Sequence, residues 1–432
     1  MSDTAVAPVA KAARVQSLDV LRGISLLGIL MMNITAFGLL GQAYSNPLAD
    51  GGAEGWNKVA YDVIQVGFEG TMRGIFSLLF GAGIVLMTDR MERAGAGIMA
   101  AEIHFRRMLW MMLFGVIHWA LLLWYGEILF AYSLCGLVLF APRKLPAKTQ
   151  IIAALLLLAC AAAITGYKAN ALVETQAVAQ MAEQAKAAGQ KLNHEQEEAI
   201  KGWGEAMEHY TPSPEAAAGQ RALHSGSWWQ AVTGQWEFSY EFQWTTAPYW
   251  LLFDMIPFML LGMGLLKLGY LGGGKPVRTY VTMMLAGYAI GLPLGWYELQ
   301  HIYAGQFSPI AFSEADRTYQ FSRLAMVIGH LGLALTVIRL GWLRGLQRAL
   351  ATVGQMALSN YIAQTLICTA LFFGFGFGLY GHFERHQLYL VVAAIWLAEL
   401  VWSPLWLARF RFGPMEWLWR SLTYWERQPM KL

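Results

Sequence analysis

Several ionisable side chains lie inside long apolar segments of the chain, where a charge is costly and generally serves a function. Arg73, Asp254, His330 and Glu399 fall near the middle of such segments when depth is counted at about 1.5 Å per residue. An imidazole titrates near neutral pH and can act as a general base. His118, somewhat nearer the outer side, and His330 are therefore the candidate bases for proton chemistry.

Carboxyl and guanidinium groups at similar depth could support such a base. Glu69 and Arg73 are four residues apart, so on one continuous helix they would share a face and could form an ion pair. Asp254 or Glu69 could orient a histidine, and Arg73 could stabilise developing negative charge. The predicted catalytic set is His118, His330, Asp254, Glu69 and Arg73. The alternatives are a structural ion pair and hydrogen-bonded core histidines.

A second set of polar residues lies toward the ends of the apolar segments. Guanidinium groups on the cytoplasmic side could bind nucleotide phosphates, although Asp19 and Arg22, three residues apart, could also pair simply to fix the first segment. The predicted substrate-binding set is Asp19, Arg22, Arg106, Arg107, Asp62 and Glu127. We predict no metal site and no tightly bound cofactor. The three cysteines form no CxxC pair, which excludes a disulfide framework, a zinc ribbon and a thioredoxin-type motif.

The composition indicates which class of protein contains these residues. The 432 residues are 56% hydrophobic and 14% charged, whereas a soluble domain carries about 25% charged residues. A net charge of +3 is too small to indicate nucleic-acid binding. We therefore predict an all-α polytopic membrane protein.

A spanning helix needs about 20 apolar residues, and ten segments are candidates. They are residues 18–40, 61–87, 107–125, 127–141, 149–166, 246–266, 279–300, 320–338, 350–373 and 387–408. Lys and Arg collect in cytoplasmic loops, and most of those in the loops, Lys11 and Arg14 among them, share one side if both termini are cytoplasmic. We expect a bacterial inner-membrane protein.

The spacing of these segments predicts three regions. Residues 1–166 form a first bundle of five helices, and residues 246–432 form a second bundle of five with a cytoplasmic tail. Residues 167–245 form one large extracytoplasmic helical loop, broken by proline at 212 and 214. This loop is either a spacer on the outer face or a lid over an outward-facing site. Gly81–Gly83 and Gly262–Gly264 favour close helix packing. Gly-rich faces are compatible with a homodimer.

The opening run RVQSLDVLRGISLLGILMMNI, residues 14–34, resembles that of the YeiB-like bacterial inner-membrane proteins, whose domain has no known function. Further stretches that resemble this family are GIFSLLFGAGI (74–84), FGVIHWALLLWYGEILFAYSLCGL (114–137), GQMALSNYIAQTL (354–366) and RFRFGPMEWLWRSLTY (409–424). The resemblance covers nearly the whole chain outside residues 167–245.

The same opening is similar to that of the transmembrane acyltransferases, including heparan-α-glucosaminide N-acetyltransferase. Asn33 and the Trp56-Asn57 pair followed by Asp62 match residues of those enzymes. Their key histidine precedes the Trp-Asn pair, but residues 50–55 contain no histidine. The resemblance thus implies transfer of an acyl group from cytosolic acyl-CoA, as a cosubstrate, to an extracytoplasmic or lipidic acceptor, with His118 or His330 taking over the proton chemistry.

Two other functions fit the same pattern. A proton-coupled transporter or flippase for a small or lipidic solute would use the buried carboxyl groups and histidines as a relay or binding site. A scaffold that holds membrane lipids between its helices would explain the tryptophan-rich outer surface but not the mid-depth charges. Neither half of the chain repeats the polar positions of the other, which favours acyl transfer slightly over transport.

Overall fold

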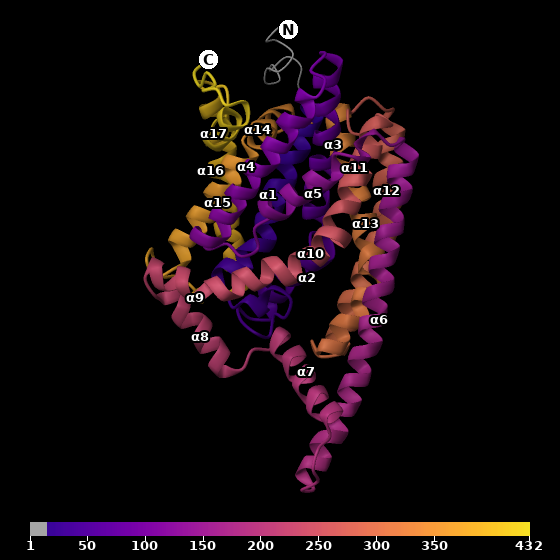
Figure 1. The fold of residues 1–432 in the computed structure, drawn as a ribbon, viewed down its shortest axis with the longest axis vertical. Coiled ribbons are helices and arrows are strands. Elements are labelled where there is room, and N and C mark those ends of the chain that lie inside the picture. The colour runs from indigo at the N-terminus through magenta and orange to yellow at the C-terminus, as the bar shows by residue number, and fades with distance from the viewer. Residues whose placement is uncertain (1–14) are drawn as a thin grey trace.

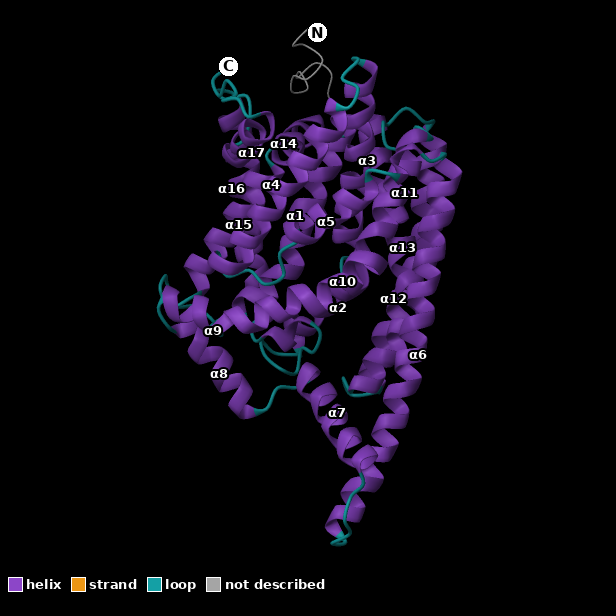
Figure 2. Cartoon of the chain, viewed as in Figure 1, coloured by secondary structure: helices purple, strands orange, loops and turns teal. Residues whose placement is uncertain are grey.

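The computed structural model describes residues 15–432, apart from the side chains of Thr246, Ala247 and Trp250. Lys11 and Arg14, which entered the predicted orientation, lie outside the described residues. In the described part of the chain, all named secondary-structure elements are helices (Figure 2). The all-α prediction is therefore confirmed.

The helices form an elongated bundle from which a helical hairpin projects (Figure 1). The bundle comprises α1 Gln16–Gly38, α2 Gly55–Gly67, α3 Thr71–Arg93, α4 Met99–Leu121, α5 Leu129–Leu139, the first part of α6 Ala147–Ala187, α11 Ile256–Lys267, α12 Val277–Ala304, α13 Pro309–Leu340, α14 Arg344–Gln355, α15 Ala357–Phe372, α16 Arg385–Leu407 and α17 Pro414–Tyr424. The far end of α6 and α7 His194–Tyr210 make the projecting hairpin, followed by α8 Pro214–Ser225, α9 Trp228–Glu241 and the short α10 Ala247–Trp250.

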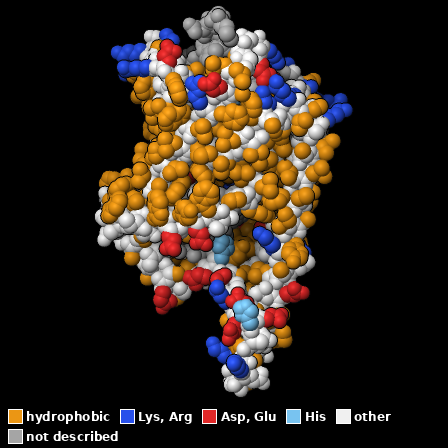
Figure 3. All heavy atoms as spheres, in the orientation of Figure 1, with side chains coloured by type: hydrophobic (Ala, Val, Ile, Leu, Met, Phe, Trp, Pro, Cys, Tyr) orange, Lys and Arg blue, Asp and Glu red, His pale blue; other side chains and the backbone are white. Residues whose placement is uncertain are grey.

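In the part of the chain that the structure describes, five stretches are long and apolar enough to cross a membrane. They are Gln16–Gly38, Gly55–Arg93, Ala147–Ala187, Pro309–Leu340 and Arg385–Leu407, and α5 and α15 are shorter apolar helices. The molecular surface carries a broad apolar band between two ends where charged side chains gather (Figure 3). Together with the apolar helices of spanning length, this band is typical of the surface of a membrane protein.

The two ends of the bundle are each assembled from loops distant in sequence. We call the end toward α17 the tail end and the end toward α7 the hairpin end (Figure 1). At the tail end, Arg143 donates to Glu92 at 2.7 Å and Arg106 donates to the carbonyl of Thr423 at 3.1 Å.

At the hairpin end, Asn57 donates to Glu384 at 2.9 Å. Asn46 donates to the carbonyl of Tyr210 at 3.0 Å. The loops predicted for one membrane side thus contact one another.

Four predicted spans differ from the helices observed. The expected helix over 61–87 is broken between α2 and α3, where Gly70 has φ +62°. The expected helix over 350–373 is broken at Met356. The expected helix over 246–266 is interrupted by a π-helical turn at 251–255, after which α11 begins, and another π-helical turn, 242–246, leads into it.

The fourth difference concerns α6. This helix continues without interruption past residue 166 to Ala187, so the predicted boundary at 166 falls inside it. Its Ala-rich sequence has high helix propensity and contains no glycine cluster or proline that would end it at the membrane surface. The spacer or lid region therefore begins as a direct extension of a bundle helix.

Two glycines bring α3 and α11 into close contact. A Cβ atom built on Gly81 would overlap the carbonyl of Met259, and one built on Gly262 would overlap the carbonyl of Leu78. Small residues allow such backbone approach between helices in a membrane. The contact fixes α3 against α11. It thereby also sets the distance between side chains that lie one or two turns before these glycines in the two segments.

The contact can be tested with neighbouring glycines of α3. Gly81→Ala should lower the free energy of unfolding by about 1–3 kcal/mol, because the added methyl group meets backbone rather than a movable side chain. Gly83→Ala is the matched control, since nothing lies within 4 Å of its added Cβ, and it should be neutral or stabilising by about 0.5–1 kcal/mol. Thermal unfolding in detergent would measure both; equal stability of the two variants would contradict the packing argument.

Candidate binding site at the hairpin end

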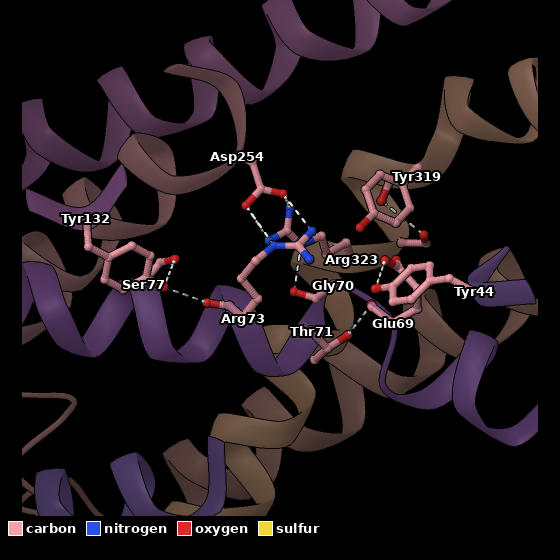
Figure 4. A network of polar contacts seen from close by, with 11 residues as sticks. Tyr44, Glu69, Gly70, Thr71, Arg73, Ser77, Tyr132, Asp254, Tyr319 and Arg323 are labelled. Atoms are coloured by element: carbon pink, nitrogen blue, oxygen red, sulfur yellow. Dashed lines mark hydrogen bonds and ion pairs between the residues drawn. The ribbon is translucent and has the colours of Figure 1, made fainter. Parts of the chain in front are cut away.

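The strongest concentration of buried charge is an ion network centred on Asp254 (Figure 4). Arg73 donates from Nε to Oδ1 at 3.2 Å and from Nη2 to Oδ2 at 3.0 Å. Arg323 donates from Nη2 to Oδ1 at 3.1 Å and from Nη1 to Oδ2. One carboxylate thus accepts bidentate hydrogen bonds from two guanidinium groups, the strongest geometry available to this pair of side chains.

Three segments contribute these groups, and two of the three are interrupted locally. Arg73 lies in the first turn of α3, directly after the left-handed Gly70. Asp254 lies in the π-helical turn 251–255, a feature frequent at functional sites. Arg323 comes from the middle of α13, and its Nε also donates to the carbonyl of Gly70 at 2.9 Å. A side chain at Gly70 would overlap the hydroxyl of Tyr319, so this turn requires glycine.

The network lines a cavity of about 310 Å³. Its polar lining includes Tyr44, Glu69, Arg73, His209, Tyr249, Asp254, Glu298, Asp316, Tyr319 and Arg323. Four carboxyl groups face two guanidinium groups, so the lining is formally negative when all six are ionised. The cavity is in the range of a small-molecule site.

The carboxyl groups differ in their partners. Glu298 of α12 accepts from the hydroxyls of Thr318 at 2.8 Å and Ser322 at 2.9 Å. Glu69 accepts from the Tyr44 hydroxyl at 3.5 Å. Asp254 alone is shared between two arginines. Neutral hydroxyls stabilise an ionised carboxylate less than a guanidinium does, so Glu298 is better suited than Asp254 to take up a proton or bind a cation.

The hairpin contributes part of this wall. His209 and Tyr210, at the end of α7, line the cavity. Burial lowers the pKa of His209, which keeps the imidazole neutral near neutral pH and able to accept a hydrogen bond. Burial, together with the neighbouring Glu69, raises the pKa of Tyr44, so that phenol remains a donor.

The predicted catalytic residues fall into two groups. Arg73, Asp254 and Glu69 meet at the cavity. The expectation that Glu69 and Arg73 share a helix face was wrong, because Glu69 lies in the break before α3. His118 and His330 do not line this cavity.

His118 lies in a separate buried cluster instead. Its Nε2 is 2.8 Å from the hydroxyl of Thr365, and its Nδ1 is 3.9 Å from Glu127. Glu127 accepts from the backbone N–H groups of Leu129 and Phe130 and so caps the first turn of α5. His118, from the predicted catalytic set, and Glu127, from the predicted substrate-binding set, therefore lie close together in this cluster.

His330 lies elsewhere on α13. Its Nδ1 is 3.0 Å from the carbonyl of Met326, one turn earlier, and its ring makes edge contacts with Phe68 and Tyr288. The intrahelical hydrogen bond and the aromatic contacts account for its position within the bundle.

The remaining predicted substrate-binding residues are dispersed. Arg22 pairs with Asp19 at 3.2 Å at the start of α1. Arg106 pairs with Glu102, and the guanidinium of Arg107 stacks 4.1 Å above the Trp419 ring. The four predicted residues Asp19, Arg22, Arg106 and Arg107 therefore all lie at the tail end.

Asp62 lies at the hairpin end, where it accepts from Lys58 at 2.6 Å and from the hydroxyl of Tyr303 at 2.7 Å. The structure does not bring the predicted substrate-binding set together in one place.

Arg323, Glu298 and Asp316 line the site but were not in the predicted set. The sequence offered a signal for two of them, because Arg323 and Glu298 are ionisable residues at the edge of apolar segments. Within residues 15–432 no group of three or more His, Cys, Asp and Glu side chains could hold a metal ion.

Comparisons with known proteins find relatives that are similar to this chain over nearly its whole length. Residues 265–426 match the family described as "Protein of unknown function (DUF418)". The chain is 31% identical to the uncharacterized protein YeiB of Escherichia coli over 94% of this chain and 95% of that protein. It is 30% identical to the uncharacterized protein YxaH of Bacillus subtilis over 96% of both chains. No solved structure matches. The protein belongs to the YeiB-like DUF418 family.

The ion network makes a direct prediction about stability. Asp254→Asn should lower the free energy of unfolding by about 3–5 kcal/mol, because it leaves two buried guanidinium groups without a counter-charge. Asp89→Asn in α3 is the matched control, since Asp89 is 42% exposed and 3.9 Å from an exposed arginine, and it should change stability by less than about 1 kcal/mol. Chemical unfolding in detergent would compare them. Similar values for both variants would mean that the network is not required for the fold.

Proposed function

We propose that the protein crosses the bacterial inner membrane several times, with both termini and the tail end in the cytoplasm. The contacts within each end support this orientation, because loops rich in Lys and Arg meet at the tail end while loops 41–58, 208–220 and 384–386 meet at the hairpin end. The positive-inside rule then assigns the hairpin end to the outer side.

We further propose that the protein is a proton-coupled transporter of a small solute that bears an amino group. The observation that carries this proposal is the polar cavity at the hairpin end, lined by four carboxyl groups and two guanidinium groups. Ionisable residues in a membrane segment are typical of substrate pathways and proton relays. The excess of carboxyl groups favours a cationic or zwitterionic solute.

The geometry suggests a role for each group. An ammonium group would lie near Glu298 and Asp316, and a carboxylate on the solute, where present, would face Arg73 and Arg323. Glu298 would exchange a proton as the solute enters, since its partners are hydroxyls that can also donate to or accept from a protonated carboxyl. The end of α7 would act as the lid, because His209 and Tyr210 form part of the cavity wall.

Acyl transfer from acyl-CoA is the second candidate, and the His118 cluster is the observation that favours it. Glu127 lies close enough to orient the imidazole, and Thr365 contacts its other nitrogen. In this version the acceptor would occupy the cavity and His118 would be the general base. The two candidates differ in whether coenzyme A binds and whether a proton gradient matters.

Proton-coupled transport can be tested in proteoliposomes that enclose a pH-sensitive dye. A panel of small amines and amino acids should include a solute that drives proton movement in the wild type. In Glu298→Gln this flux should fall about tenfold or more, because the variant loses the titrating group and a charge-assisted contact. Glu205→Gln is the control, since Glu205 is 70% exposed on α7 and pairs loosely with Lys201, and it should behave as the wild type.

Thermal stability with coenzyme A and acetyl-CoA separates the two candidates. A transporter should show no saturable shift. A ligand that binds only the folded protein stabilises it by about 2.7 kcal/mol at a hundredfold excess over its Kd, so such a shift, together with the absence of solute-driven proton flux, would replace transport by acyl transfer. Equal flux in Glu298→Gln and wild type would exclude the proposed proton site.

A further inference from the structure

A second large cleft lies at the tail end, away from the ion network. Its volume is about 570 Å³, and its polar lining consists of Gln16, Arg339, Arg344, Gln347 and Arg348. Gln16 begins α1, and the other four come from the junction between α13 and α14. Among residues 15–432, the cleft lining therefore presents three arginines and two amides but no carboxylate.

The turn between the two helices determines this arrangement. Helix α13 ends at Gly341 with φ +66°, and Leu343 has φ +53° before α14 begins. The Gln347 side chain donates to the carbonyls of Val337 and Trp342 at 3.2 and 2.6 Å. The turn is thus tied by its own side chain, and it places Arg339 on the last turn of α13 beside the first turns of α14.

The three arginines remain exposed and are free to bind an anion. Arg344 and Arg348 are one turn apart on α14 and share a face. Among the residues described, no carboxylate forms an ion pair with Arg339, Arg344 or Arg348, in contrast to the nearby Arg22, which has Asp19. Three like charges in one cleft repel one another, and an anion that binds among them would relieve that repulsion.

The immediate surroundings of the cleft are apolar and exposed. Trp342 is 60% exposed, Leu343 67% and Leu346 44%. Tryptophan beside arginine is typical of the membrane–water boundary, where the ring lies at the level of the lipid headgroups. A soluble anion would use the arginines but would leave these apolar side chains uncovered. A lipid would contact both.

We propose that this cleft binds the phosphate of an acidic phospholipid in the leaflet at the tail end. Guanidinium groups bind phosphate oxygens in bidentate fashion, and Trp342 and Leu343 would pack on the glycerol and upper acyl chain. The proposal is independent of the function of the cavity at the hairpin end. Basic clusters at helix ends in a membrane are suited to such headgroups.

Native mass spectrometry of the intact protein with added phosphatidylglycerol or phosphatidylcholine tests the proposal. The wild type should retain phosphatidylglycerol in preference to phosphatidylcholine. Each single change, Arg339→Gln, Arg344→Gln or Arg348→Gln, should weaken phosphatidylglycerol binding about fivefold, and the triple variant should abolish the preference. Arg344→Lys keeps the charge but loses the bidentate geometry, and it should fall between wild type and Arg344→Gln.

The matched control is the triple variant Arg278→Gln, Arg409→Gln and Arg411→Gln, which removes three other exposed arginines from the same end. Retained preference in this control, with an unchanged unfolding temperature of both triple variants, supports a defined site. An equal loss in both would mean a diffuse surface charge effect and would overturn the proposal. Displacement of phosphatidylglycerol by coenzyme A or inorganic phosphate at micromolar concentration would also overturn it, in favour of a soluble phosphate.

Discussion

The need to neutralise buried charge in a membrane-embedded bundle constrains this structure most strongly. Asp254 is held between Arg73 and Arg323, and each of these three groups would be costly to bury alone. Their encounter requires three chain segments, α3, the π-helical turn before α11, and α13, to converge at one depth. Backbone contact at Gly81 and Gly262 holds α3 against α11 and so keeps two of these segments close together.

The cavity exists because helices that could have been continuous are interrupted beside it. At the break at 68–70 the carbonyl of Gly70 accepts from Arg323 as well as from the N–H group of Gly74, and Asp254 comes from the π-helical turn at 251–255. Non-helical backbone at membrane depth is tolerated where protein or a water-filled cavity covers it. The same interruptions that weaken the helices therefore supply the polar groups and the space for a ligand.

The sequence predicted an all-helical membrane protein and close helix packing at glycines of α3 and α11, and it singled out Arg73, Asp254 and Glu69, which the structure places in one cavity wall. These depend on local properties such as hydropathy, charge and residue size. It did not predict that His118 and His330 lie apart from the cavity, because residues at equal depth can face different helices. Arg323 was missed as the third member of the network for the same reason, since its partners are 69 and 253 residues away in the chain.

The packing of the bundle also restricts how the cavity could open. Arg73 and Asp254 belong to the pair α3 and α11, held by backbone contact. Glu298 and Arg323 belong to the pair α12 and α13, whose glycines Gly287 and Gly332 likewise allow close backbone approach. The two pairs meet at the cavity through the contact of Asp254 with Arg323. Relative movement of the pairs would have to break this contact, and a proton or a solute that competes for either group would lower the cost of breaking it.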